Sequence, residues 1–183
     1  ENFPLAEAHL DRALPLALAR GKRGFAGQIR LCRGQVRFWS GRVAAGLDDM
    51  IAGLDALDTL APAARAELEP LNGPHAVIGP GTLTMNLAIA GRFVEAEARA
   101  LRALAALPAG EGGDASHAAV FLGLAFLHTD RARLDEARHA FGRARELMRA
   151  AGNTLMLARS AHIMLHEFVL RYHADDLTWR EQL

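Results

Sequence analysis

The feature that most constrains the fold is a stripe of small and apolar residues that recurs four times along the chain. Each stripe occupies offsets 0, 3, 7, 10 and 14, and offsets 3 and 10 are Ala or Gly in every copy. The stripes begin at Phe3, Val43, Phe93 and Leu134, which are 40, 50 and 41 residues apart. Such offsets return to one face of an α-helix, where small side chains let a neighbouring helix approach closely. The sequence therefore predicts a helical repeat of about 40 residues.

These stripes predict the second helices of tandem antiparallel pairs, near 3–20, 43–58, 93–107 and 133–151. The first helices are expected near 24–40, 76–90, 115–128 and 155–172, with a short extra helix at Pro62–Glu69. One pair cannot bury its own stripe, so the pairs are expected to stack into an α-α superhelix. We predict a single all-α domain over 1–183. We also expect the chain to be a piece of a longer protein, because the repeat pattern starts on the second helix of one pair and stops before the second helix of the last pair.

Composition excludes several classes of protein. The longest apolar run, 118–127, is ten residues and too short to cross a bilayer, so no membrane association is expected. The single Cys excludes an internal disulfide, and no signal peptide is recognisable, so a cytoplasmic location is expected. A net charge of zero argues against nucleic acid binding by this segment. The chain has 20 Arg and one Lys; we interpret this mainly as the signature of a GC-rich genome, with selection for anion contacts as the alternative.

The helix near 24–40 holds most of the candidate binding residues. Its predicted buried stripe is Phe25, Ile29, Cys32, Val36 and Trp39. Cys32 is accordingly expected to be a buried, inert thiol. Two interpretations stay open for Leu31 and Phe38, which flank this stripe: core between adjacent pairs, or the lining of a ligand groove.

Arg30, Arg33 and Arg37 share another face of the same helix. They are a candidate site for a phosphate or an acidic partner, against the simpler interpretation of a solvated face. On the first helices, polar side chains are candidates for holding a peptide in a groove, although they form no regular Asn ladder. They are Gln28, Gln35, Asn86 and His117.

His162 and His166 lie one helical turn apart, with Glu167 beside the second, and two such imidazoles can ligate a transition metal. They are weak candidates, because the order is not His-Glu-x-x-His and no third ligand stands at a fixed spacing. A solvated polar face is the favoured interpretation. No Ser or Cys nucleophile motif accompanies the histidines. We therefore expect no catalytic residues, no metal site and no cofactor.

Two stretches resemble tetratricopeptide-type repeats. One is Leu122-Gly123, Phe126, Ala137, Phe141 and Ala144, which resembles the consensus in its Leu-Gly pair, its aromatic residue, and its Ala, Phe and Ala; its turn, His128–Leu134, is two residues longer. The other is Gly91-Arg92-Phe93-Val94-Glu95-Ala96, which resembles the usual turn and entry to the second helix.

The period near 40, with runs such as Leu31-Cys32-Arg33-Gly34-Gln35-Val36 and Leu134-Asp135-Glu136-Ala137-Arg138, is similar to the degenerate repeats of bacterial LuxR-type and cyclase-like signalling ATPases. That resemblance implies a sensor or scaffold region between an ATPase module and a DNA-binding module. Gly21-Lys22 lacks the upstream glycine of a phosphate-binding loop, so no ATPase residue is assigned.

The expected function is therefore non-catalytic binding of a protein, a peptide or a small-molecule inducer, together with contacts to flanking domains of a parent transcriptional or signalling regulator. A peptide-binding receptor or adaptor is the first alternative, and a metal-dependent enzyme at His162 and His166 is the second. A homodimer is also possible, because exposed repeat ends carry apolar stripes.

Overall fold

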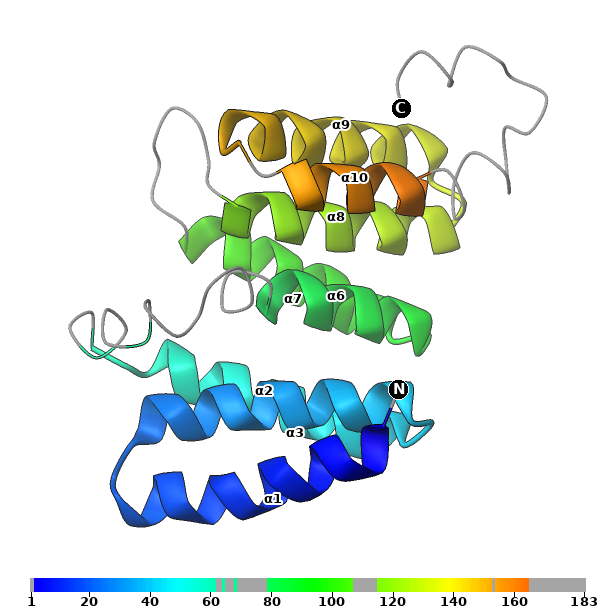
Figure 1. The fold of residues 1–183 in the computed structure, drawn as a ribbon. Coiled ribbons are helices and arrows are strands. Elements are labelled where there is room, and N and C mark those ends of the chain that lie inside the picture. Colours follow the sequence, from blue (N-terminus) through cyan, green and yellow to red (C-terminus); the bar gives the residue numbers. More distant parts are fainter. Residues whose placement is uncertain are drawn as a thin grey trace. The chain divides into compact units, whose positions relative to one another are not determined.

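The computed structural model describes residues 2–61, 64, 68, 79–106, 115–152 and 154–164, and these contain α-helices and no strand (Figure 1). The all-α prediction is confirmed for this part of the chain. Contacts divide the chain into two compact units, Glu1–Gly79 and Pro80–Leu183. The helices are α1 (Phe3–Ala19), α2 (Arg23–Trp39), α3 (Val43–Asp58), α6 (Gly79–Ile89), α7 (Phe93–Ala106), α8 (Ala115–Asp130), α9 (Leu134–Ala150) and α10 (Thr154–Ile163).

Six of these helices, α1, α2, α3, α7, α8 and α9, begin and end within two residues of the expected ranges. Helix α6 starts at Gly79, and residues 76–78 lie outside the described part of the chain, as do 165–172 of the last expected helix. The short helix expected at Pro62–Glu69 also lies outside it, apart from positions 64 and 68. No helix within the described ranges combines the length and apolarity needed to cross a membrane.

Five of the helices, α1, α2, α6, α8 and α9, are followed by a tight turn of the same kind. The second residue of each turn has a left-handed backbone, with φ between 53° and 89°, at Gly21, Gly41, Gly91, Ala132 and Gly152. In four of the turns the following amide donates a hydrogen bond of 2.8–2.9 Å to the carbonyl oxygen five residues back, as Lys22 does to Ala17. This pairing satisfies the last carbonyls of the helix and reverses the chain. The turn between α8 and α9 is no longer than the others, because the two extra residues extend α8 to Asp130.

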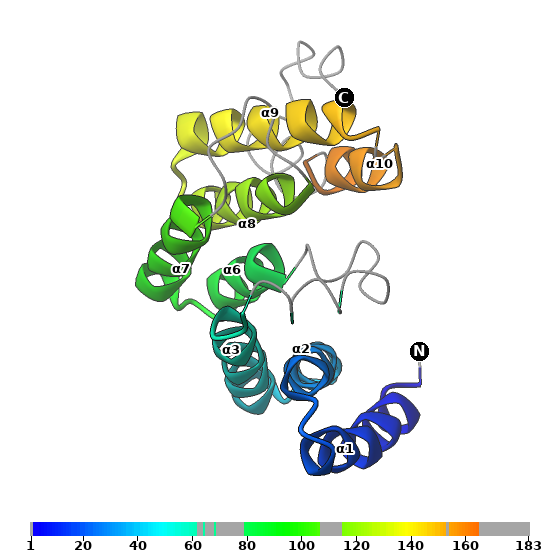
Figure 2. The same ribbon diagram turned by 90° about the vertical axis from the view of Figure 1, so that its left-hand side faces the viewer.

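In the first unit, α2 and α3 pack backbone against backbone. A Cβ atom built on Gly34 would lie 2.6 Å from the carbonyl oxygen of Gly46, and one on Gly46 would lie 2.7 Å from that of Gly34. One Cβ on Gly53 would lie 2.7 Å from the carbonyl oxygen of Gly27. The two glycine pairs are seven residues apart on each helix, so they sit on one antiparallel seam between the neighbouring helices in Figure 2. Gly46 and Gly53 are offsets 3 and 10 of the second stripe, which explains why that stripe needs small residues.

The glycine seam also decides which face of α2 is buried. The buried residues are Ala26, Gly27, Leu31, Gly34 and Phe38. The prediction that the Phe25–Trp39 stripe is the buried face is wrong: Phe25, Ile29 and Val36 are half-buried, and Cys32 and Trp39 are exposed. The apolar side chains of that stripe cannot replace glycines at a contact between backbones, so α2 turns the glycines inward. Leu31 and Phe38 belong to the core rather than to a groove.

The stripes of the second unit carry alanine at the small offsets where the stripe of α3 carries glycine. Ala96 on α7 and Ala137 and Ala144 on α9 stand at the small offsets of their stripes and are fully buried. They lie in a core whose largest fully buried side chains include Leu87, Leu127, Phe141 and Met148. In α1 the equivalent residues, Ala6 and Ala13, are only half-buried.

We predict that Gly34→Ala lowers the free energy of unfolding by about 2–4 kcal/mol, because its methyl group would overlap the backbone of α3. Gly142→Ala is the matched control: Gly142 is also inside a helix, and a Cβ there meets no atom within 4 Å. That control is expected to gain about 0.5–1 kcal/mol from the higher helix propensity of Ala. Urea denaturation measures both, and equal effects of the two substitutions would contradict the glycine seam.

Candidate functional site

Two of the three arginines expected to form a surface site, Arg33 and Arg37, lie in an ion-pair cluster that joins α1, α2 and α3. Arg33 donates from Nε and Nη2 to the two oxygens of Asp49 on α3, both at 2.7 Å, and from Nη1 to Asp11 on α1 at 2.8 Å. Arg37 donates from Nη1 to Asp49 at 2.8 Å and from Nε to Glu7 at 2.7 Å. The residues of this cluster, called the arginine cluster below, are Glu7, Asp11, Arg33, Arg37, Arg42 and Asp49.

Partial burial strengthens the arginine cluster. The side chains of Arg33 and Asp49 are 15% and 12% exposed, so their forked pairing is partly shielded from water. Hydrogen bonds from Arg42 and then from Arg37 lower the pKa of Glu7 from 4.5 to about 2, although partial burial opposes that change. Glu7 therefore stays ionised at neutral pH, and the cluster holds matched charges.

The guanidinium groups of Arg33 and Arg37 are therefore already paired with carboxylates of the same chain. The solvated-face interpretation does not describe Arg33 and Arg37, and a phosphate would have to compete with Asp49 for their donors. Arg30 is half-buried and makes no ion pair within the described residues. The sequence does carry a signal for these partners: Glu7 and Asp11 are four residues apart, as are Arg33 and Arg37, so two helices carry complementary pairs at one spacing.

The outward face of α2 carries the other candidates from this helix. Gln28 and Gln35 are half-buried, and Trp39 at the end of the face is 52% exposed, with its ring edge-on to Phe38 at 5.4 Å. Cys32 is exposed, so the expectation of a buried thiol is wrong; the glycine seam turns it away from α3. Neighbouring atoms still desolvate its sulfur, which raises the pKa of the thiol and keeps it a weak nucleophile.

The polar candidate residues of the second unit differ in how far they are buried. Asn86 is fully buried in α6 and cannot line an open groove, whereas His117 on α8 is half-buried. His162 is exposed on α10, and His166 and Glu167 lie outside the described residues. No group of three potential metal ligands occurs in the parts of the chain that the structure describes. His128 is half-buried, and desolvation lowers the pKa of its imidazole.

Comparison of the chain with protein-family models, with curated proteins and with solved structures finds no match in any of the three.

We predict that Asp49→Asn lowers the free energy of unfolding by about 1–3 kcal/mol, because it removes the carboxylate shared by Arg33 and Arg37. Its matched control is the adjacent, exposed Asp48, where Asp48→Asn is expected to change stability by less than about 0.5 kcal/mol. Thermal and urea unfolding measure both, and equal losses would show that the arginine cluster adds no stability.

A second prediction concerns pH. The pKa of Glu7 is lower in the folded chain than in the unfolded chain, so its ionised form stabilises the fold above about pH 4.5, and this contribution disappears as the pH falls toward about 2. The wild type should therefore be more stable than Glu7→Gln near pH 7, and the difference should shrink across that acidic range. Urea unfolding at a series of pH values measures it; a difference that is constant with pH would contradict the role of the carboxylate.

Proposed function

We propose that this chain is a non-catalytic, tetratricopeptide-like repeat region that binds a protein or a small-molecule inducer as part of a multidomain bacterial regulator. Two recurring features support the proposal: a turn with a left-handed second residue follows five of the described helices, and small residues mark the contacts between helices. Proteins built in this way present rigid helical surfaces, and they act far more often by binding than by catalysis.

The observation that carries the proposal is the outward face of α2. It exposes Trp39 and Cys32 beside the half-buried amides of Gln28 and Gln35. An exposed tryptophan costs little conformational entropy to immobilise and is enriched among the residues that dominate binding energy. The amides supply both donors and acceptors, so a peptide backbone or a polar small molecule can be held next to the indole.

A ligand on α2 has a physical route to the rest of the first unit. The helix that presents Gln35 and Trp39 also contributes Arg33 and Arg37, which hold α1 and α3. A ligand changes the arrangement of these helices only by the difference between its affinities for two packings. Because the glycine seam clamps α2 to α3, a change of packing is easier at the contact of α2 with α1, which depends on side chains.

Two alternatives remain. A peptide-binding receptor or adaptor would use the same α2 face, but burial of Asn86 removes one of its four candidate residues. A metal-dependent enzyme at His162 and His166 is distinguished by elemental analysis of the purified chain. Stoichiometric zinc that is lost in His166→Ala would favour the enzyme over the proposal.

The test is site-specific photo-crosslinking in cells that produce the parent protein. A photoreactive amino acid at Gln35 is expected to capture a defined protein or small molecule, whereas the same amino acid at the exposed Asp48 on α3 is not. The adduct should disappear when Trp39→Ala is added, because the indole anchors the ligand. Equal adducts at both positions, or none at Gln35, would overturn the proposal.

A further inference from the structure

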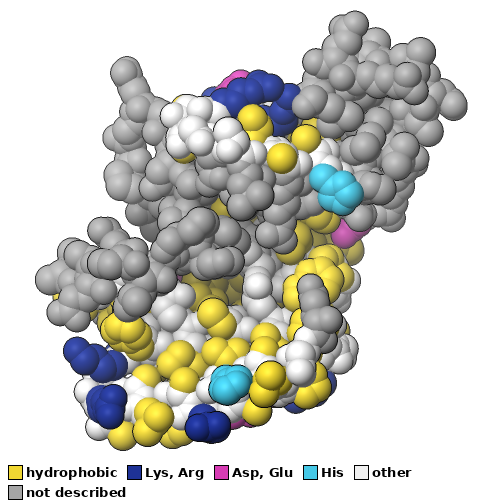
Figure 3. All heavy atoms as spheres, viewed as in Figure 1, with side chains coloured by type: hydrophobic (Ala, Val, Ile, Leu, Met, Phe, Trp, Pro, Cys, Tyr) yellow, Lys and Arg dark blue, Asp and Glu magenta, His cyan; other side chains and the backbone are white. Residues whose placement is uncertain are grey.

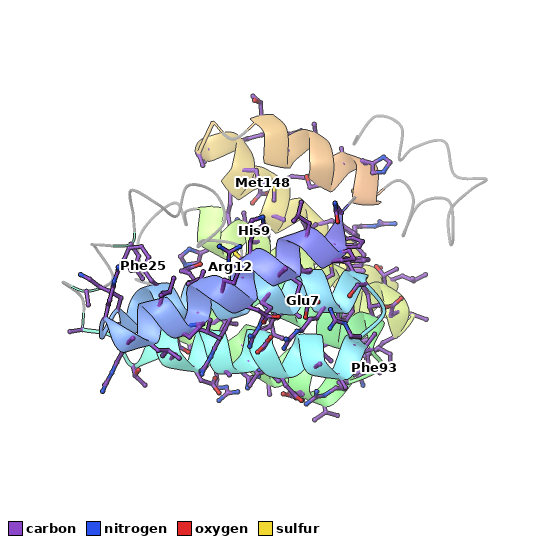
Figure 4. The ribbon with its side chains drawn as sticks, turned by 60° about the horizontal axis from the view of Figure 1, so that its bottom comes forward. Glu7, His9, Arg12, Phe25, Phe93 and Met148 are labelled. Atoms are coloured by element: carbon purple, nitrogen blue, oxygen red, sulfur yellow. The ribbon has the colours of Figure 1, made fainter. Side chains whose placement is uncertain are left out.

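Helix α1 carries an exposed stripe on the side that does not pack against α2. Leu5, His9, Arg12 and Leu16 follow one another at intervals of four, three and four residues, which is the spacing of a helix-packing seam. All four are exposed, with Leu16 at 58%. Figure 4 shows His9 and Arg12 on the side of α1 away from Glu7. We call these four residues the α1 seam.

Charge is segregated between the two sides of α1. Its acidic residues, Glu7 and Asp11, are both held by arginines of α2 or by Arg42. The seam and the turn after α1 carry exposed cations that form no ion pair with any residue in the described part of the chain: Arg12, Arg20, Lys22 and Arg23. Basic, apolar and histidine side chains share the lower face of the first unit in Figure 3.

We infer that the α1 seam docks an acidic amphipathic helix. Apolar side chains of that helix would cover Leu5 and Leu16, which are the two ends of the stripe. Its carboxylates would pair with Arg12 in the middle and with the cations of the α1–α2 turn at one end. The apolar contacts supply affinity, and the one-sided charge selects an acidic partner.

Two other occupants fit less well. A second copy of the chain, pairing antiparallel through the same stripe, would bring the Arg12 and His9 positions of both copies together without any carboxylate between them. A nucleic acid would leave Leu5 and Leu16 uncovered, since phosphates pair only with the cations.

The inference rests on the proposed function in making this chain a binding module, but it uses a different helix. The probe is a capped peptide of about 18 residues, long enough to span α1, with Leu at seam spacing, Glu beside it and Ala elsewhere. It carries a fluorophore, and binding to the full 183-residue chain is followed by fluorescence anisotropy. A second peptide replaces every Glu with Lys.

We expect the Glu peptide to bind the wild type at least about tenfold more tightly than the Lys peptide, and its affinity to fall as salt is added. Arg12→Glu and Leu16→Ser should each weaken binding of the Glu peptide by about tenfold. Matched controls lie on α7: Arg102→Glu makes the same charge change, and Leu101→Ser removes a leucine that is 57% exposed. Neither control should alter binding. Arg12→Glu should also improve binding of the Lys peptide.

Several results would overturn the inference, once circular dichroism shows that the variants are folded. One is equal affinity of the wild type for the Glu peptide and the Lys peptide. Another is that the α7 controls lose as much affinity for the Glu peptide as Arg12→Glu and Leu16→Ser do. Self-association that Leu16→Ser abolishes would make a second copy the occupant. Binding of a single-stranded RNA oligomer that depends on Arg12 and not on Leu16 would make the site one for nucleic acid. Failure of the peptide leaves crosslinking at Gln35 unaffected, so the two proposals fail separately.

Discussion

The contact on which the first unit depends is the one between the backbones of α2 and α3. Two pairs of glycines bring the helices so close that carbonyl oxygens of one lie where side chains of the other would begin. This contact fixes the rotation of α2 about its axis. Leu31 and Phe38 then become core, Arg33 and Arg37 reach Asp49 on α3, and Cys32 and Trp39 are left outside. The core, the arginine cluster and the candidate binding face are three consequences of one rotation.

The sequence predicts the helices well because helix limits depend on local signals. Gly21, Gly41, Gly91 and Gly152 mark left-handed turns that other residues adopt at a cost, and the stripe of small residues repeats with the helices. The rotation of α2 differs from the prediction for a physical reason. A search for apolar stripes selects the helix face with the most hydrophobic side chains, and on α2 this is the Phe25–Trp39 face. The face of α2 that packs against α3 carries glycines. Glycine has no side chain, so a search for hydrophobic residues does not recognise this face as part of the core.

The site was only partly predictable for a related reason. The sequence places Arg33 and Arg37 on one face of a helix, but a charged face has the same pattern whether it meets water, a ligand or another helix. Their partners come from α1 and α3, between 12 and 30 residues away, so no local window contains both sides of a pair. The matching interval of four residues in Glu7–Asp11 and Arg33–Arg37 is the signal that joins them. It becomes informative only when the helices are known to be neighbours.

The arginine cluster also accounts for the difference in charge between the two sides of α1. An acidic residue on a surface helix can pair with cations on its own helix, as Glu95 does with Arg99 on α7. On α1 both carboxylates are drawn toward Arg33, Arg37 and Arg42, so no acidic side chain among the described residues of this helix is left to balance Arg12. A structural interaction inside the unit thereby produces a basic, leucine-bearing face outside it. Charge selectivity at the α1 seam follows from the same ion pairs that hold α1 to α2, so a change that frees Glu7 or Asp11 would act on stability and on recognition together.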